Sequence, residues 1–233
     1  MNFKGHAKTS LIDFPGHLAT VFFTGGCNFR CPMCHNADLV VHSNSMPTIP
    51  EDYIYEFLEK RKEKLTGIVI TGGEPTLHPG LIKFIFKAHE LGYAIKLDTN
   101  GYDPGRLEAL LTMRLLDYVA MDVKAPIEKY ALLTGITDID VHYIEQSIAI
   151  LSSSNITYEL RTTVVPDLLE TSDIISIAYW LSSKNLDCTW YLQPFRPGNT
   201  LDPTLTSTYS VQELHTMANL ASEIFPTASL RGM

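Results

Sequence analysis

Residues 18–36 read Leu-Ala-Thr-Val-Phe-Phe-Thr-Gly-Gly-Cys-Asn-Phe-Arg-Cys-Pro-Met-Cys-His-Asn. The first seven are apolar or β-branched, which predicts a strand over Leu18–Thr24. Two glycines end this strand, and Cys27, Cys31 and Cys34 follow directly. The same order, a buried strand and then a turn of unusual composition, recurs along the chain and indicates its fold class.

Strands and helices are predicted to alternate from this segment onward. The further strands predicted cover Gly67–Thr71, Ala94–Asp98, Tyr118–Val123, Thr157–Val165 and Thr189–Gln193. The predicted helices cover Glu51–Lys64, Gly80–Leu91, Pro104–Leu111, His142–Ser153, Ser172–Ser182 and Val211–Ile224, and Gly25–Pro50 is expected to be a long loop. Such alternation implies parallel βα units. About six units do not complete an eight-fold barrel, so we expect an open, partial βα barrel with outer helices. We expect it to form one domain over residues 1–233.

The carboxyl ends of parallel strands are where ligands bind in such folds. The unusual residues of this chain come directly after the predicted strands. They are Cys27 to Asn36, Gly72 to Pro75, Asp98 to Gly101, Asp122 with Lys124, and Gln193 to Gly198. The sequence therefore predicts that five segments gather on one rim.

Composition limits the classes of partner. The formal net charge of −8 argues against nucleic acid, because phosphate backbones are bound by basic surfaces. The sequence contains no apolar run of the roughly 20 residues that span a bilayer and no signal-peptide core. We expect a cytoplasmic protein without a membrane partner.

Three of the four cysteines are clustered, which predicts a metal or cluster site in a reducing compartment rather than a disulfide framework. Thiolates suit iron–sulfur clusters and zinc. Three thiolates on a cubane leave one iron open to a small molecule. Zinc would take a fourth ligand, such as His35 or Cys188, so a non-catalytic zinc-binding module stays an alternative.

The spacing Cys27-x-x-x-Cys31-x-x-Cys34 resembles the cluster motif of the radical S-adenosylmethionine superfamily. Met33 stands where that family often has an aromatic residue. The segments Lys8–Gly16 and Cys34–Asn36 and the Arg231-Gly232 ending are similar to activating enzymes of glycyl-radical enzymes, such as pyruvate formate-lyase. Among these, the chain looks closest to activating proteins of anaerobic ribonucleoside-triphosphate reductases.

The acidic residues on the rim have two interpretations. Asp98 and Asp122 could form turns or pair with Lys124, or they could bind a hard cation through their carboxylates. Arg161, within a predicted strand, either forms a structural ion pair or meets the cofactor. Arg196 stands where the family often has a histidine, and its guanidinium could stack on a purine.

The resemblance implies a [4Fe–4S] cluster on the three cysteines and S-adenosylmethionine on its open iron. Glu74 would meet the amino group of the methionine moiety. Asp98, Thr99 and Asp122, together with the Ala120 carbonyl, would hold a monovalent cation beside its carboxylate. The remaining cofactor-binding residues implied are Met33, His35, Asn36, Gly72, Gly73, Pro75, Asn100, Lys124, Arg161, Gln193 and Arg196.

The activity implied is reductive cleavage of S-adenosylmethionine to a 5′-deoxyadenosyl radical, which abstracts hydrogen from a glycine of a partner protein. The electron donor would be a flavodoxin or ferredoxin. A radical enzyme that acts on a small molecule is the main alternative, and the Cys34-His35-Asn36 and Asp98–Gly101 motifs speak against it.

Overall fold

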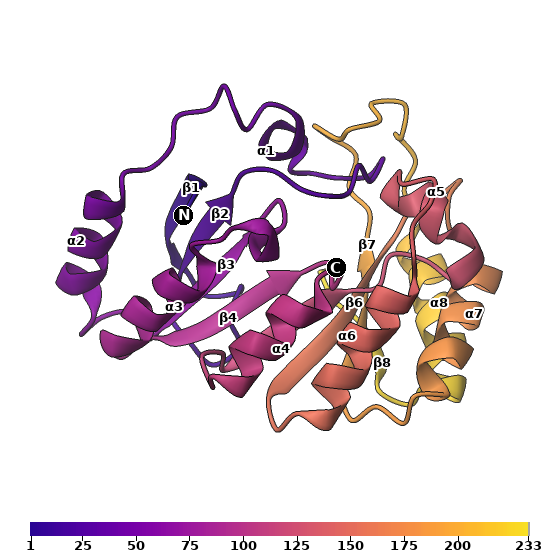
Figure 1. Cartoon of the computed structure of the whole chain (residues 1–233). Coiled ribbons are helices and arrows are strands. Elements are labelled where there is room, and N and C mark those ends of the chain that lie inside the picture. Colours follow the sequence, from indigo (N-terminus) through magenta and orange to yellow (C-terminus); the bar gives the residue numbers. More distant parts are fainter. Residues whose placement is uncertain (233) are drawn as a thin grey trace.

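The computed structural model describes residues 1–232, and their strands form a single sheet in chain order (Figure 1). The strands are β1 (Phe3–Ser10), β2 (Ala19–Thr24), β3 (Gly67–Gly72), β4 (Ala94–Thr99), β5 (Tyr118–Asp122), β6 (Thr157–Val164), β7 (Thr189–Pro194) and β8 (Ala228–Leu230). β1 is antiparallel to β2, and all the other neighbours are parallel. Within the described residues β1 and β8 do not pair with each other, so the predicted open, partial barrel is confirmed.

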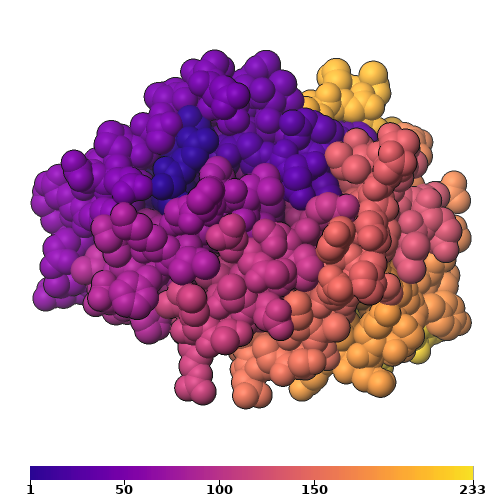
Figure 2. All heavy atoms as spheres, in the orientation of Figure 1, coloured from indigo at the N-terminus to yellow at the C-terminus, as the bar shows by residue number. Residues whose placement is uncertain are grey.

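Helices between successive strands cover the outer side of the sheet (Figure 1). They are α1 (Ala37–Val41), α2 (Glu51–Arg61), α3 (Leu81–Glu90), α4 (Pro104–Thr112), α5 (Tyr130–Thr134), α6 (His142–Ser153), α7 (Thr171–Ser182) and α8 (Val211–Ile224), with short 3₁₀ turns η1 (Pro75–Leu77) and η2 (Ile127–Lys129). The space-filling view shows one face of the molecule in the orientation of Figure 1, and side chains cover the sheet on that face (Figure 2). None of the helices in residues 1–232 has the length and apolar character that crossing a bilayer requires.

The strands bury both of their faces, as parallel strands in a barrel do. Ile68 and Ile70 of β3 and Ile95 of β4 belong to the large core beneath the helices. Val69 of β3 points to the other face, where it packs with Val21 in a smaller inner core. Because side chains alternate along a strand, the inner face also receives Asp98 and its counterparts on β5 to β7.

The six predicted central strands are present within one or two residues at each end, and two further strands of the sheet were not predicted. β8 is a seventh parallel strand of only three residues, and β1 is an added antiparallel edge strand. β1 contains Lys4, His6 and Lys8 and lacks a strong apolar alternation, because an edge strand is covered on fewer sides.

Two helix predictions were also wrong in detail. The expected loop Gly25–Pro50 contains α1, a helix of five residues that is too short to show a helical period. α2 ends at Arg61, three residues before the predicted Lys64, where the chain turns back toward β3.

Candidate cofactor site

A pocket of about 270 Å³ lies at the carboxyl ends of the central strands. The cysteine loop, Cys27–Asn36, forms one wall, and residues from the ends of β3 to β7 form the other. Its lining residues are Cys27, Phe29, Cys31, Met33, Cys34, His35, Asn36, Val40, Thr71, Gly72, Gly73, Glu74, Asp98, Thr99, Asn100, Asp122, Lys124, Arg161, Thr163 and Gln193. The prediction that five strand-end segments meet on one rim is therefore confirmed.

The three clustered cysteines are free thiols that line this pocket. Burial raises the pKa of the Cys27 thiol to about 12 and that of Cys31 to about 11. Burial also raises the pKa of Cys34. A metal that replaced these protons would relieve the unfavourable burial of thiolate charge, because metal binding is coupled to thiol deprotonation.

The metal-binding geometry differs from that of a single-ion site. Among residues 1–232, no three His, Cys, Asp or Glu side chains lie close enough together to hold one metal ion. Neither proposed fourth zinc ligand is arranged as one. Cys188 directly precedes β7 and so lies at the end of the sheet away from the pocket, and His35 Nε2 is 2.6 Å from the Arg196 carbonyl. Three thiols without a fourth protein ligand fit a larger iron–sulfur cluster with one open iron.

The cysteine loop is tied to three different parts of the barrel. Its hydrogen bonds to α5, to the segment after β7 and to the end of β3 are Arg30 N to Thr134 O (2.7 Å), Asp202 N to Pro32 O (2.9 Å) and Asn36 Nδ2 to Gly72 O (2.9 Å). Because each bond uses backbone groups of the loop or of the sheet, the thiols are held in place by the fold rather than by one another.

The turn after β3 approaches the cysteine loop too closely for side chains. Gly72 has a φ of +112°, in the region that favours glycine. A Cβ on Gly73 would lie 1.9 Å from the Gly26 carbonyl oxygen. Gly73 N and Glu74 N donate to the carbonyls of Thr24 and Gly26 (both 2.9 Å). The two glycines therefore allow the turn to pair directly with the strand that leads into the cysteines.

Glu74 is 1% exposed and its carboxylate already accepts four hydrogen bonds from the protein. The donors are Thr76 N (3.0 Å), Thr76 Oγ1 (2.7 Å), Thr99 Oγ1 (2.8 Å) and Asn100 N (2.7 Å). Burial raises the pKa of Glu74, and these bonds oppose that rise. Glu74 thus joins the turns after β3 and β4, and its predicted contact with an amino group stays a prediction.

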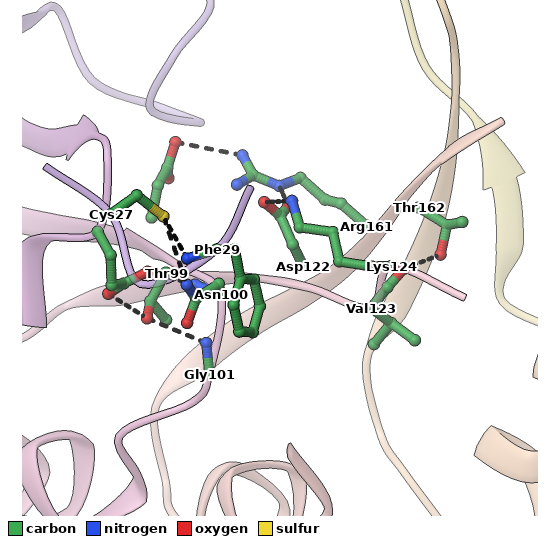
Figure 3. A network of polar contacts seen from close by, with 12 residues as sticks. Cys27, Phe29, Thr99, Asn100, Gly101, Asp122, Val123, Lys124, Arg161 and Thr162 are labelled. Atoms are coloured by element: carbon green, nitrogen blue, oxygen red, sulfur yellow. Dashed lines mark hydrogen bonds and ion pairs between the residues drawn. The ribbon is translucent and has the colours of Figure 1, made fainter. Parts of the chain in front are cut away.

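A chain of five charged side chains crosses the inner face of the barrel, and Figure 3 shows its Asp122, Lys124 and Arg161 members. Arg161 of β6 bridges two acids: its Nη1 is 3.2 Å from Asp98 Oδ2, and its Nε is 2.9 Å from Asp122 Oδ1. Lys96 Nζ lies 2.5 Å from Asp98 Oδ1, and Lys124 Nζ lies 2.7 Å from Asp122 Oδ2. The structural ion pair expected of Arg161 is therefore present, and since Arg161 also lines the pocket, its contact with the cofactor stays a prediction.

These five side chains carry three positive and two negative charges, and Arg161 and Lys124 are the two cations among them that line the pocket. Burial by itself would raise the pKa of Asp122, but Arg161 and Lys124 outweigh it and lower that pKa to about 2. Arg161 and Lys96 likewise hold the pKa of Asp98 below its usual value against burial. Both acids therefore stay ionised at neutral pH, and each keeps two cationic partners.

Three predicted site residues, Pro75, Ala120 and Arg196, do not line the pocket. Pro75 is buried as the first residue of η1, and Arg196 is exposed, with its Nη2 donating to the Gly232 carbonyl (2.7 Å). Four lining residues were not predicted: Phe29, Val40, Thr71 and Thr163. Thr71 and Thr163 could have been found by alternation, since each lies two residues from an inward-facing position of its strand.

The amino-acid sequence matches the family model described as the radical SAM superfamily over residues 21–175. The chain belongs to this superfamily. A protein of Methanocaldococcus jannaschii that carries the provisional name glycyl-radical enzyme activating enzyme is 34% identical over 208 residues, which cover 85% of this chain and 82% of that protein. The pyruvate formate-lyase 1-activating enzyme of Escherichia coli is 29% identical over 171 residues, which cover 70% of this chain and 67% of the relative.

Among solved structures, Streptococcus suis SuiB bound to S-adenosylmethionine shares the fold with a TM-score of 0.70 and 13% identity, over 89% of this chain and 48% of that chain. As a member of the superfamily, the chain is a radical SAM enzyme of the oxidoreductase type, with a [4Fe–4S] cluster and S-adenosylmethionine as its cofactors. Cys27, Cys31 and Cys34 are the residues that would hold the cluster, because they alone among the four cysteines line the pocket.

Proposed function

We propose that this radical SAM enzyme activates a glycyl-radical enzyme by abstracting hydrogen from a glycine of that partner. The observation that supports it best is that three thiols line one pocket together with the ion-paired side chains of Asp98, Asp122, Lys124 and Arg161. The similarity to glycyl-radical enzyme activating enzymes over most of the chain gives the substrate class.

The chain's own residues have three tasks in this proposal. The cysteines hold the cluster and leave one iron free. Gly72 and Gly73 bring a backbone without side chains to the pocket. The charged side chains around Arg161 face the methionine carboxylate. The two cofactors together supply the 5′-deoxyadenosyl radical. The pocket residues bind and orient S-adenosylmethionine, and no side chain has to act as an acid or base.

The finer parts of the proposal concern the partner and the setting. An anaerobic ribonucleotide reductase is the proposed partner, and a flavodoxin or ferredoxin the proposed electron donor, in the cytoplasm. The net charge of −8 supports a protein partner rather than nucleic acid, and no membrane partner is proposed. Arg196 is also proposed to contact the adenine. This contact requires its guanidinium to leave the Gly232 carbonyl.

An electron paramagnetic resonance experiment on the partner protein tests the function. The reconstituted, reduced enzyme is mixed with S-adenosylmethionine and a candidate glycyl-radical enzyme, and electron paramagnetic resonance should show a glycyl doublet. The doublet should be missing when the partner's glycine is replaced by alanine. Cleavage of S-adenosylmethionine without a radical on any candidate partner would favour a small-molecule substrate instead.

A second experiment tests the cluster assignment through metal content. Cys27→Ala, Cys31→Ala and Cys34→Ala should each lose bound iron and sulfide after anaerobic reconstitution, whereas Cys188→Ala should keep them. Cys188 is the matched control because it is buried away from the pocket. A colourless wild-type protein with one zinc ion per chain would overturn the proposal.

A further inference from the structure

Lys96 is a buried lysine on the inner face of β4, two residues before Asp98. Residues two apart on a strand share a face, so its side chain runs along the barrel interior toward Asp98. It is 3% exposed, and its Nζ lies 2.5 Å from Asp98 Oδ1 and 5.8 Å from the centre of the Tyr118 ring. A buried ammonium needs such partners, because an unpaired charge is costly to remove from water.

The ligands expected for a monovalent cation are already engaged. Each of the four carboxylate oxygens of Asp98 and Asp122 has one cationic nitrogen of Lys96, Arg161 or Lys124 within 3.2 Å. Thr99 Oγ1 donates to Glu74 Oε1 (2.8 Å) and accepts from Gly101 N (3.2 Å). The residues present therefore do not fit the cation that the family resemblance implied.

The charge balance leads to the same conclusion. Three cations and two anions leave the five side chains around Arg161 with one excess positive charge, and Glu159, the next carboxylate on β6, is paired with Arg231. A bound sodium or potassium ion would add a second uncompensated charge in a buried place, or it would have to displace an ammonium. One excess charge already matches a single carboxylate of the cofactor.

We propose that Lys96 is a resident ammonium that takes the place of the monovalent cation, so that this enzyme binds S-adenosylmethionine without sodium or potassium. Lys96 is a positioning residue, because it neutralises Asp98 and so lets Arg161 and Lys124 present their charge to the pocket. The inference rests on S-adenosylmethionine binding, which the superfamily shares, and does not depend on the identity of the partner protein.

Affinity for S-adenosylmethionine under different salts tests this inference. The dissociation constant of the reconstituted wild type, measured by equilibrium dialysis, should be the same in choline chloride, sodium chloride and potassium chloride of equal ionic strength. Lys96→Met should bind about tenfold more weakly in choline chloride, the size expected for one charged contact. Sodium or potassium should restore part of that affinity in Lys96→Met alone.

Lys60→Met is the matched control, because Lys60 is exposed on α2 and pairs only with Glu56 of the same helix. It should behave as the wild type in all three salts. A wild type that needs sodium or potassium for tight binding would overturn the inference by itself, even if Lys96→Met failed to fold. Equal loss of affinity by Lys96→Met in every salt would also overturn it.

A readout on the cluster-free protein separates this inference from the enzyme's activity. The sodium-23 resonance should stay narrow in the presence of the wild type and broaden with Lys96→Met, in which Asp98 is left open to an ion. Broadening by the wild type that Asp98→Asn removes would show a cation site and contradict the inference. Neither result depends on whether a glycyl radical forms, so failure here and failure of the proposed function can be told apart.

Discussion

Gly73 lies where the turn after β3 passes beside the cysteine loop, and it has no room for a side chain. We predict that Gly73→Ala pushes the two segments apart, because the new Cβ would lie 1.9 Å from the Gly26 carbonyl oxygen. The expected cost is about 1–3 kcal/mol of unfolding free energy, as for other overpacked sites. Urea denaturation and the affinity for S-adenosylmethionine are the measurements, and both should fall.

Gly198→Ala is the control for that prediction. Gly198 lies in the exposed segment after β7, and no atom lies within 4 Å of the position of its added Cβ. It should keep the stability and the cofactor affinity of the wild type. Unchanged binding by Gly73→Ala would mean that the turn and the cysteine loop do not have to touch.

Glu74 connects two turns through one buried carboxylate, and this connection can be tested with an isosteric change. We predict that Glu74→Gln destabilises the protein by about 1–3 kcal/mol, because the new side-chain NH2 group would face a backbone N–H or a hydroxyl that also donates. The amide orientation that keeps the three bonds to Oε1 turns the NH2 group toward Asn100 N, which loses its acceptor and loosens the turn after β4. Thermal unfolding of the cluster-free protein measures this loss without any contribution from the cofactor.

A weaker affinity for S-adenosylmethionine with no loss of stability in Glu74→Gln would contradict this structural role. That result would instead favour the direct contact between Glu74 and the amino group that the sequence predicted. The two outcomes separate a residue that shapes the pocket from one that touches the cofactor.

At the scale of elements, β1 carries a histidine, His6, whose pKa is changed by its packing against β2. The His6 ring stacks on Phe22 of β2 with centroids 4.4 Å apart, and its Nε2 is 2.8 Å from Thr20 Oγ1. Burial, helped by the charge of Lys8, lowers the pKa of His6 to about 4. The folded state therefore binds a proton less readily than the unfolded chain.

The sign of the resulting pH dependence follows from linkage. The stability that neutral His6 contributes is present above about pH 6.5, its unfolded value, and is lost as the pH falls toward 4. We predict a loss of about 1–2 kcal/mol over this range after allowance for the half-exposed ring, and a shallower pH profile in His6→Gln. His89→Gln, which alters an exposed ring of α3, should keep the wild-type profile, and parallel profiles for all three proteins would exclude His6 as the cause.

Elements with a strong pattern were predictable, and those that depend on their neighbours were not. β2 to β7 are continuous apolar runs because both faces of a parallel strand are buried. β8 has only three residues, and its partner β7 gives it strand geometry through pairs such as Leu192 with Leu230. α1 likewise depends on the packing of its buried Ala37, Leu39 and Val40, since five residues are too few for a helix to form alone.

At the scale of the whole molecule, the end of the chain returns to the barrel interior. Arg231, directly after β8, pairs through Nη1 and Nη2 with the two oxygens of Glu159 on β6 (2.5 and 2.6 Å) and stacks on the Tyr191 ring. Tyr118 on β5 donates to the same carboxylate. Burial would raise the pKa of Glu159, but Arg231 and Tyr118 hold it below its usual value. Residues more than 100 positions apart thus share one buried charge.

We predict that Arg231→Met destabilises the protein by about 3 kcal/mol, because it leaves the Glu159 carboxylate buried without its cation. The double variant Glu159→Gln/Arg231→Met should recover a large part of this loss, since no unpaired charge remains. Denaturant unfolding of the wild type, both single variants and the double variant completes the cycle. Additive losses would show that the pair does not couple β8 to β6.

The sequence by itself determined the chemistry and the class of fold. Three cysteines at fixed spacing need no tertiary information to indicate a cluster, and regular alternation of apolar runs with amphipathic segments indicates parallel βα units. The rule that parallel strands end on one rim then placed most of the lining residues correctly, from Met33 to Gln193.

Only the tertiary structure decided how the charged residues share their partners. The sequence offered Asp98 and Asp122 as cation ligands, and it gave Lys96 no role. β4 pairs with β5 and β5 pairs with β6, so Lys96 reaches Asp98, Lys124 reaches Asp122 and Arg161 reaches both acids. A buried charge is stabilised by the opposite charges that the fold brings within about 4 Å of it. The local sequence pattern does not contain that distance.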